Sequence, residues 1–316
     1  MAEDPRSLLS SALSLWWLRP ENGLAIASYI LYGYNFAPKA GQCAADFACG
    51  DGVNTFFKAG GRFDPEFDIF GSAVRHETAN QVVGQSIDVF DHFDDSYGPK
   101  TVKRPSERFR YGTDRKSNLL QKARALDYYV DLLEVDLAEE PAIEDESLDI
   151  AYCNSLYWIA QPEVAVKHIY RKLKPNGIGV FDVMTTHRRA LHFQNLFPTL
   201  PADWHDLMNR GRDRNNPGLR SGSDWRALIA ACGDIVIEDE RDIFPSAIAQ
   251  AWNFGLRPLF PVLNRMASGL SLINRKEIKA EWVEIWTRVL LPLLVDPAQF
   301  SNNGARVRLQ YVVRKR

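Results

Sequence analysis

The sequence predicts an α/β fold: a doubly wound, mostly parallel sheet with an antiparallel last strand, joined to an N-terminal helix and a helical cap. Three observations predict it. Short apolar or β-branched runs alternate with helix-period stretches between residues 43 and 184, a glycine-rich turn follows the first run, and an aromatic helical segment precedes the last one. With 316 residues, 46% of them hydrophobic, the chain can bury a sizeable core.

The N-terminal segment, residues 1–42, is expected to be helical. Its apolar stretch at 8–18 follows two acidic residues and has no basic n-region, which favours an amphipathic helix over a signal peptide. Trp16 and Trp17 have two interpretations of equal weight. Either they pack this helix onto the sheet, or the segment covers a ligand.

The central elements follow from their periodicity. Strands are expected at 43–49, 107–113, 129–135, 148–153, 178–184, 234–239 and 305–313. Helices are expected at 117–126 and 162–173, where apolar residues recur every three or four positions. The turn at 174–177 should end the second helix, because Asn176 and Gly177 tolerate a positive φ. The last two strands would be antiparallel if they are neighbours.

Two segments do not belong to a minimal fold of alternating strands and helices. Residues 60–106 are interpreted as an insertion, and the helical stretch 244–296 as a cap that packs apolar side chains rather than facing a membrane. The domain assignment is therefore 1–42 as a helical segment, 43–243 with 297–316 as the sheet domain, and 244–296 as the cap.

Composition excludes several classes of function. Lys and Arg number 38 against 40 Asp and Glu, so binding to a phosphate backbone by counterion release is not expected. The four cysteines form no C-x-x-C pair, which argues against zinc and a disulfide framework and favours a reducing cytoplasm. The longest apolar run near the C-terminus, 289–295, is too short to span a membrane.

The chemistry-bearing motif is the strand-turn-helix stretch at 44–55, Ala-Ala-Asp-Phe-Ala-Cys-Gly-Asp-Gly-Val-Asn-Thr. Glycines there let the backbone approach a ligand, and a helix start offers unpaired amides to an anionic group. A dinucleotide fingerprint needs a third glycine where Thr55 stands, so that pattern fails. The motif indicates a nucleotide-like ligand.

Further motifs stand in a recognisable order. They are Tyr-Gly-Thr-Asp at 111–114, Leu-Glu-Val-Asp-Leu at 133–137, Glu-Asp-Glu-Ser-Leu-Asp-Ile-Ala-Tyr-Cys-Asn-Ser at 144–155 and Tyr-Arg-Lys-Leu-Lys-Pro-Asn-Gly at 170–177. Together with the glycine-rich turn, this series resembles the class I S-adenosylmethionine-dependent methyltransferases, in particular their type 11-like bacterial group. The resemblance covers residues 42–186 and implies a Rossmann-like methyltransferase sheet.

The resemblance also implies the cofactor, S-adenosylmethionine, and the residues that hold it. Those residues are Asp46, Ala48, Gly50 and Gly52 in the turn, Asp114 for the ribose, Asp136 and Leu137 for the adenine, Asn154, and Arg19 for the methionine carboxylate. Ala48 departs from the family pattern, which has glycine there. An acidic ribose partner usually follows the glycines by about 20 residues, so Asp68 competes with Asp114 by spacing.

Two residues are candidates for catalysis because each follows a strand at the edge where α/β sheets bind ligands. His187 follows the fifth strand and is the candidate general base, and Tyr157 follows the fourth. No metal site is expected. The cluster Asp88, Asp91, His92, Asp94 and Asp95 has suitable ligand types, but a solvated acidic loop is the preferred interpretation.

The predicted function is methyl transfer from S-adenosylmethionine to an O, N or C nucleophile of a small-molecule, glycan or lipid-linked acceptor in the cytoplasm. No nucleic-acid partner and no transmembrane segment are expected, and the oligomeric state stays open. Two alternatives remain: a non-catalytic binding protein that retains the fold, and an NAD-dependent oxidoreductase.

Overall fold

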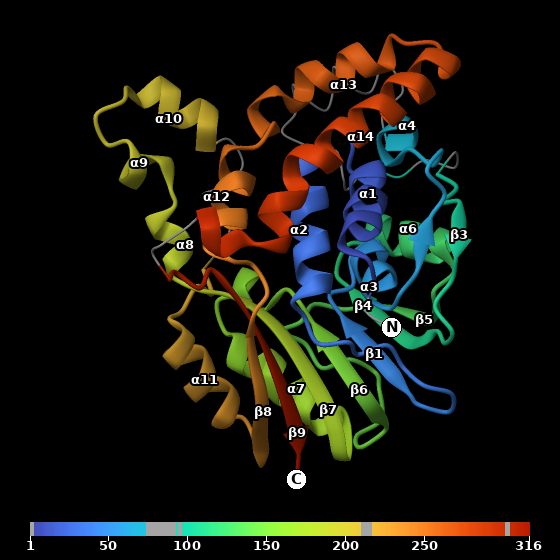
Figure 1. Ribbon diagram of the computed structural model, residues 1–316. Coiled ribbons are helices and arrows are strands. Elements are labelled where there is room, and N and C mark those ends of the chain that lie inside the picture. Colours follow the sequence, from blue (N-terminus) through green and yellow to red (C-terminus); the bar gives the residue numbers. More distant parts are fainter. Residues whose placement is uncertain (1–2, 74–92, 94–96, 210–216, 301–303) are drawn as a thin grey trace.

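A seven-stranded sheet forms the centre of the molecule, with helices on both faces (Figure 1). The computed structural model describes residues 3–73, 93, 97–209, 217–300 and 304–316. The strands of the sheet are β1 (Ala44–Phe47), β4 (Phe109–Asp114), β5 (Tyr129–Glu134), β6 (Leu148–Cys153), β7 (Leu173–Met184), β8 (Ile235–Asp242) and β9 (Arg308–Lys315). Each overlaps a strand predicted from the sequence.

The strand order is β5-β4-β1-β6-β7-β9-β8. Among the strands that the structure describes in this sheet, only β9 runs against the others, since it is antiparallel to both β7 and β8. All four residues of β1 are buried, as expected for a strand whose two faces are both covered. The chain builds β4 and β5 on one side of β1, then β6 and β7 on the other. The order therefore reverses at β1, where open α/β sheets bind their ligands. The predicted sheet with an antiparallel last strand is confirmed.

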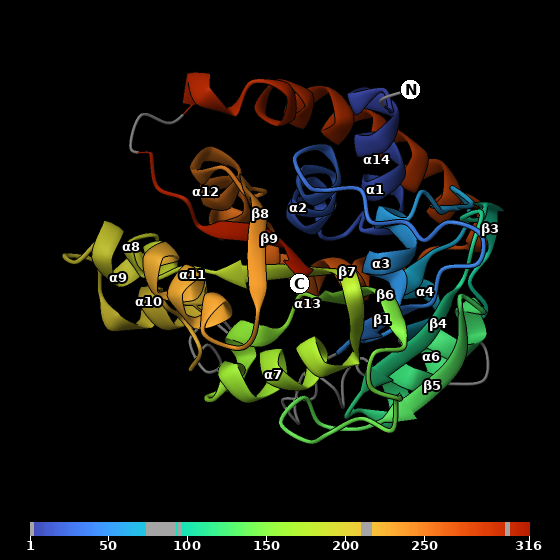
Figure 2. The ribbon, with the colours of Figure 1, turned by 90° about the horizontal axis from the view of Figure 1, so that it is seen from below.

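Two core clusters lie on the two faces of the sheet. The helices that cover the faces are α2 (Pro20–Leu31), α3 (Val53–Lys58) and α6 (Ser117–Leu126) on one, and α7 (Pro162–Lys172) and α11 (Gly222–Ala230) on the other. In Figure 2 the sheet is seen from below, with α2 and α3 on one side and α7 on the other. The 117–126 helix agrees with its predicted bounds.

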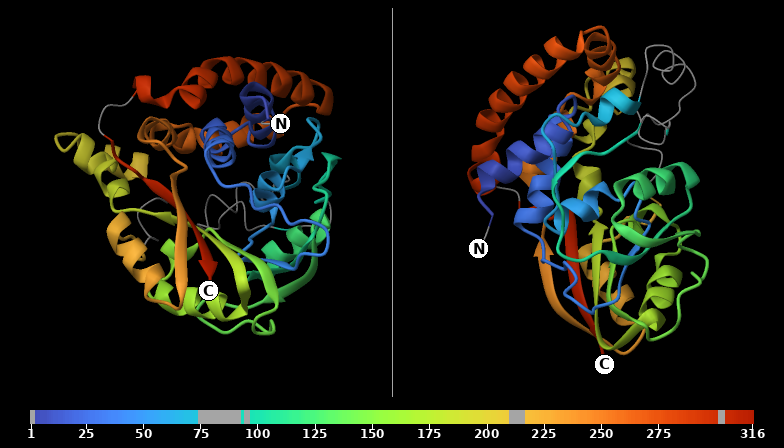
Figure 3. Two further views of the ribbon diagram at one scale, coloured as in Figure 1. Left: turned by 60° about the horizontal axis from the view of Figure 1, so that its bottom comes forward. Right: turned by 90° about the vertical axis from the view of Figure 1, so that its right-hand side faces the viewer.

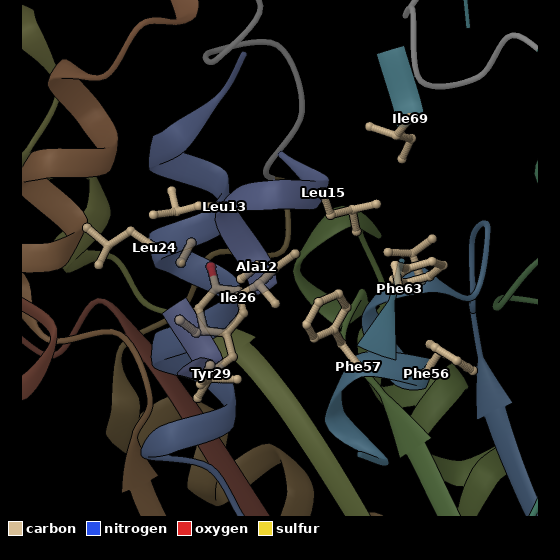
Figure 4. Packing of buried hydrophobic residues seen from close by; sticks show 14 of the residues in the cluster. Ala12, Leu13, Leu15, Leu24, Ile26, Tyr29, Phe56, Phe57, Phe63 and Ile69 are labelled. Atoms are coloured by element: carbon tan, nitrogen blue, oxygen red, sulfur yellow. The ribbon is translucent and has the colours of Figure 1, made fainter. Parts of the chain in front are cut away.

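The N-terminal segment forms two helices where one was predicted. The first, α1 (Pro5–Leu15), is capped by the Asp4 carboxylate, which accepts from the Ser7 amide. The chain then restarts as α2 at Pro20, a residue suited to the first turn of a helix. Side chains of α1 and α2 converge with Phe57 and Phe63 in one apolar core (Figure 4).

A cap of helices closes this side of the molecule. Its elements are α12 (Ser246–Phe254), η3 (Arg257–Leu259), α13 (Phe260–Ser268), α14 (Leu272–Val295) and η4 (Pro297–Phe300). The indole of Trp282 donates to the carbonyl of Trp17, so this tryptophan pair joins the cap to the N-terminal helices. The long helix α14 lies over α1 and α2, which separate it from the sheet (Figure 3). No helix among the described residues combines the length and apolarity required to cross a bilayer.

Smaller elements complete the described chain. They are β2 (Arg62–Phe63), α4 (Ile69–Ala73), β3 (Thr101–Lys103), η2 (Leu156–Trp158), α8 (His187–Ala190), α9 (Phe193–Leu196) and α10 (Ala202–Asn209). Within the stretch 60–106, β2 and β3 pair with each other and not with the main sheet. The acidic cluster Asp88, Asp91, His92, Asp94 and Asp95 lies outside the described residues. Among the described ones, no group of His, Cys, Asp or Glu could hold a metal ion.

One predicted boundary is wrong. The turn at 174–177 was expected to cap the second helix, but that helix ends at Lys172 and Leu173 is already extended. The turn lies inside β7, where the register against β6 shifts. Asn176 does adopt a positive φ of 66°, so the residue supplies the expected conformation within a strand irregularity instead of a helix cap.

Candidate functional site

The motifs meet at one edge of the sheet because their strands are parallel neighbours. Phe47, the last residue of β1, lies opposite Thr113 of β4 and Cys153 of β6. The residue that follows each of these three strand positions therefore reaches the same edge of the sheet. These three residues are Ala48, Asp114 and Asn154.

The turn after β1 is fixed by three successive backbone amides that donate to the end of β4. Ala48 N donates to Thr113 Oγ1 at 3.3 Å, Cys49 N to the Thr113 carbonyl at 2.7 Å, and Gly50 N to Asp114 Oδ2 at 2.9 Å. Gly50 and Gly52 have φ of 59° and 76°, which glycine adopts without steric penalty. Ala48 has φ 57°, so the residue that departs from the family pattern holds a conformation costing an alanine about 1–2 kcal/mol.

Gly52 serves the packing of the turn. A Cβ at this position would lie 2.6 Å from the ring of Tyr129, and one at Gly112 would lie 2.8 Å from the same ring. The Tyr129 hydroxyl reaches across β4 and donates to Asp46 Oδ2 at 2.7 Å. Sequence reasoning missed Tyr129, since nothing in its local pattern distinguishes it from a core aromatic residue.

Asp46 is fully buried beneath the turn. Burial raises the pKa of its carboxyl to about 7, although the Tyr129 hydrogen bond acts in the opposite direction. Asp46 and Gly52 are not among the described residues that border the cleft beside the turn. These two predicted cofactor residues therefore support the turn and do not line the cleft.

A cleft of about 470 Å³ opens at this edge. Its lining residues are Ala48, Cys49, Gly50, Asp114, Arg115, Lys116, Leu119, Val135, Asp136, Leu137, Asn154, Ser155, Trp158 and Ile159. The volume lies in the range of small-molecule and cofactor sites. Six of the predicted cofactor residues, Ala48, Gly50, Asp114, Asp136, Leu137 and Asn154, line it together.

The lining chemistry fits a nucleoside. Asp114 and Asp136 bring two carboxylates, which accept hydrogen bonds from hydroxyl or amino groups. Each also accepts a local backbone amide, Lys116 N for Asp114 and Ala138 N for Asp136, which holds its orientation. The side chains of Leu119, Val135 and Leu137 supply apolar surface for a planar base. The residues present therefore fit the predicted cofactor.

Asp68, the competing acidic residue, is engaged elsewhere. Its carboxylate accepts from Arg275 Nε of α14 at 2.7 Å, and this pair is mostly buried. Burial would raise the pKa of Asp68, but the Arg275 guanidinium holds it below its usual value. Asp68 thus links the insertion to the cap, whereas Asp114 lies in the cleft.

Arg19 does not reach the cleft. Its guanidinium pairs with the Glu21 carboxylate at 2.5 Å and lies over the ring of Phe260 in the cap. The pair is buried, and an arginine so enclosed is satisfied by its own carboxylate. Arg19 is not among the described residues that line the cleft, and its role toward a methionine carboxylate stays a prediction.

The two catalytic candidates lie in different surroundings. His187 is exposed at the start of α8, with Nδ1 3.3 Å from the Arg306 carbonyl. Tyr157 is buried in η2, between cleft residues Ser155 and Trp158, and its ring faces the Arg308 guanidinium at 5.4 Å. Neither residue is among those that line the cleft, and Tyr157 lies directly behind its wall.

A buried polar network extends from this wall across the sheet. Lys58 Nζ donates to Asp182 Oδ2 at 2.5 Å, and the hydroxyl of Tyr152 donates to the same oxygen at 2.7 Å. Gln310 Nε2 satisfies the other oxygen of Asp182. Burial would raise the pKa of Asp182, but Lys58 and nearby cations hold it below its usual value. Sequence reasoning missed this network, because its members come from four separate elements.

Arg308 connects the network to the cleft. Its guanidinium lies 3.9 Å from Asp182 and 4.5 Å from the Tyr29 ring centroid, and one amino group donates to the carbonyl of Asn154. Two buried cations, Lys58 and Arg308, therefore face one carboxylate.

A larger hollow of about 740 Å³ lies elsewhere, between α1, β2 and α14. It includes Ser7, Ser14, Phe63 and Val283, and no residue of the motifs. Because its lining carries none of the chemistry gathered at the strand ends, we assign the functional site to the smaller cleft.

Comparison with known proteins gives one family match. Residues 103–181 match the model of a methyltransferase domain. The comparison with curated proteins finds no match. Similar solved structures include an S-adenosylmethionine-dependent methyltransferase from Mesorhizobium loti, at 13% identity, covering 87% of this chain and 91% of that one with a TM-score of 0.43. Another is the geranyl diphosphate C-methyltransferase from Streptomyces coelicolor A3(2), at 10% identity, 94% and 77% coverage and a TM-score of 0.44.

The family match spans β4 to β7, the part of the sheet that carries Asp114, Asp136 and Asn154. It confirms the methyltransferase resemblance drawn from the motifs and, with it, S-adenosylmethionine as the cofactor.

Proposed function

We propose that this S-adenosylmethionine-dependent methyltransferase transfers its methyl group to an oxygen, nitrogen or carbon nucleophile of a small-molecule, glycan or lipid-linked acceptor. The observation that supports the proposal is the meeting of Asp114, Asp136 and the positive-φ turn around one cleft at the strand ends. The bound cofactor supplies a methyl group already activated on a sulfonium centre.

The chain's own residues would bind the cofactor and orient it. Asp114 would accept the ribose hydroxyls, and Asp136 the amino group of the adenine. The apolar side chains of Leu119 and Leu137 would hold the base between them. Close approach of the ligand to the backbone at Gly50 is possible because this residue has no side chain.

Catalysis would depend on aligning the acceptor atom with the methyl group of the cofactor. Holding two reactants in the reactive geometry can contribute about 7–11 kcal/mol, and a base is needed only when the acceptor holds its proton at neutral pH. Of the two candidates we retain Tyr157, because it lies behind the cleft wall beside Arg308. His187, exposed on α8, is the weaker candidate.

The test is methyl transfer from labelled S-adenosylmethionine to a panel of small-molecule, glycan and lipid-linked acceptors. Transfer to one acceptor class, reduced at least tenfold in Tyr157→Phe when that acceptor is a hydroxyl, supports the proposal. A folded protein that binds S-adenosylhomocysteine yet transfers to none of the panel would instead support the non-catalytic alternative.

A further inference from the structure

The two ends of the cleft differ in chemistry. Asp114 and Asp136 lie at or just beyond the ends of β4 and β5, on one side of β1 in the strand order. Asn154 and Ser155 follow β6, the neighbour of β1 on the other side. With the adenine and the ribose at the first end, as the proposed function has them, the sulfonium of the cofactor would lie toward the end of β6.

The wall of the cleft at the β6 end carries no carboxylate among the described residues. Its lining residues are Asn154, Ser155, Trp158 and Ile159. Three oxygens of this segment already accept hydrogen bonds. The Asn154 carbonyl accepts from Arg308 at 3.3 Å, and Asn154 Oδ1 accepts from the Ser155 hydroxyl at 2.8 Å. The Ser155 carbonyl accepts from the Trp158 amide at 3.0 Å. A positive group at this end therefore meets no opposite charge in the described wall.

Trp158 offers an electron-rich surface at the same end. It is the only aromatic residue among the described residues that line the cleft, and it is 48% exposed. Its ring packs against the ring of the buried Tyr157, with the centroids 5.3 Å apart and an interplanar angle of 36°. The face of an aromatic ring carries partial negative charge, and indole attracts cations more strongly than the other aromatic side chains.

We propose that the indole face of Trp158 contacts the sulfonium of bound S-adenosylmethionine. A sulfonium is a cation that has no N–H or O–H to donate, as a quaternary ammonium is, and aromatic faces recognise cations of this kind. The charge is present only before methyl transfer, because the electron pair of the broken S–CH3 bond stays on sulfur. Trp158 therefore favours the charged cofactor over the neutral product, S-adenosylhomocysteine.

Calorimetric titration of the full chain with each of the two ligands tests the contact. The readout is the Kd for S-adenosylhomocysteine divided by the Kd for S-adenosylmethionine. Trp158→Leu should lower this ratio roughly two- to fivefold, the size expected of a cation–π contact at a half-exposed site. Trp158→Phe keeps a smaller aromatic face and should give an intermediate ratio. Lost packing alone would weaken the binding of both ligands alike and would cancel in the ratio.

Ile159→Ala is the matched control, because Ile159 lines the same end of the cleft and has no aromatic face. It should keep the wild-type ratio, and all three variants should keep a Tm close to that of the wild type, since neither residue is fully buried. An unchanged ratio in Trp158→Leu, or an equal fall in Ile159→Ala, would overturn the contact and leave the cofactor assignment in place. A folded wild type that binds neither ligand would overturn the cofactor assignment and this contact with it.

Discussion

The Asp114 carboxylate accepts a hydrogen bond from the Gly50 amide at 2.9 Å, across 64 residues of chain. This contact ties the end of β4 to the turn after β1. The other oxygen of Asp114 accepts from Lys116 N at 2.9 Å. One side chain therefore positions the turn and borders the cleft, so its removal should affect both cofactor affinity and stability.

Asp114→Ala should weaken the affinity for S-adenosylhomocysteine at least tenfold, because the variant loses the acceptor proposed for the ribose. It should also lower the free energy of unfolding by about 1–2 kcal/mol through the two lost hydrogen bonds. Calorimetric titration and urea unfolding measure the two effects. Asp68→Ala is the control, since it breaks the pair with Arg275 and should leave the affinity unchanged. Weaker affinity in Asp68→Ala alone would transfer the ribose role to Asp68.

Gly52→Ala should destabilise the fold by about 2–4 kcal/mol. The new alanine would have to keep the left-handed backbone φ of Gly52, and its Cβ would lie 2.6 Å from the Tyr129 ring. Gly60→Ala separates the two causes, because Gly60 has φ 91° and no atom within 4 Å of its would-be Cβ. That control should cost about 1–2 kcal/mol, the backbone penalty alone. Equal losses in the two variants, measured by urea unfolding, would show that Tyr129 does not constrain the turn.

Ala48→Gly should leave the protein as stable as the wild type or more stable by up to about 1 kcal/mol. Glycine removes the penalty of φ 57°, which exceeds the added entropy of the unfolded chain. Ala45→Gly, in the buried strand β1, has no such penalty to relieve and should be destabilising. A loss of stability in Ala48→Gly as large as that in Ala45→Gly would contradict the strained conformation.

Asp46→Asn should gain stability relative to the wild type as the pH rises. The pKa of Asp46 is raised to about 7 in the folded protein, against about 4 when unfolded, so the native state binds the extra proton between these values. The contribution of Asp46 is therefore fully present below pH 4 and is lost as the pH rises through 7. Unfolding free energies of both proteins between about pH 5 and pH 8 test this. A constant difference would mean that Asp46 ionises normally.

The sequence predicted the centre of the sheet well because strands such as β1 and β6 are buried on both faces and read as short apolar runs. It also placed Asp114, Asp136 and Asn154 at one edge, since parallel strands end together. The pairing of Arg19 with Glu21, two residues away, was not predicted from the sequence. The parts of the site that the sequence did not predict depend on contacts between residues far apart in the chain. Tyr129 donates to Asp46 across β4, and Lys58 donates to Asp182 in the interior.

Calorimetric titration of the wild-type protein with S-adenosylhomocysteine, beside NAD, tests the central claim that the cleft at the strand ends holds S-adenosylmethionine. We expect S-adenosylhomocysteine to bind at one molecule per chain and NAD to give no heat of binding. A folded sample that binds NAD alone, or neither ligand, would contradict it.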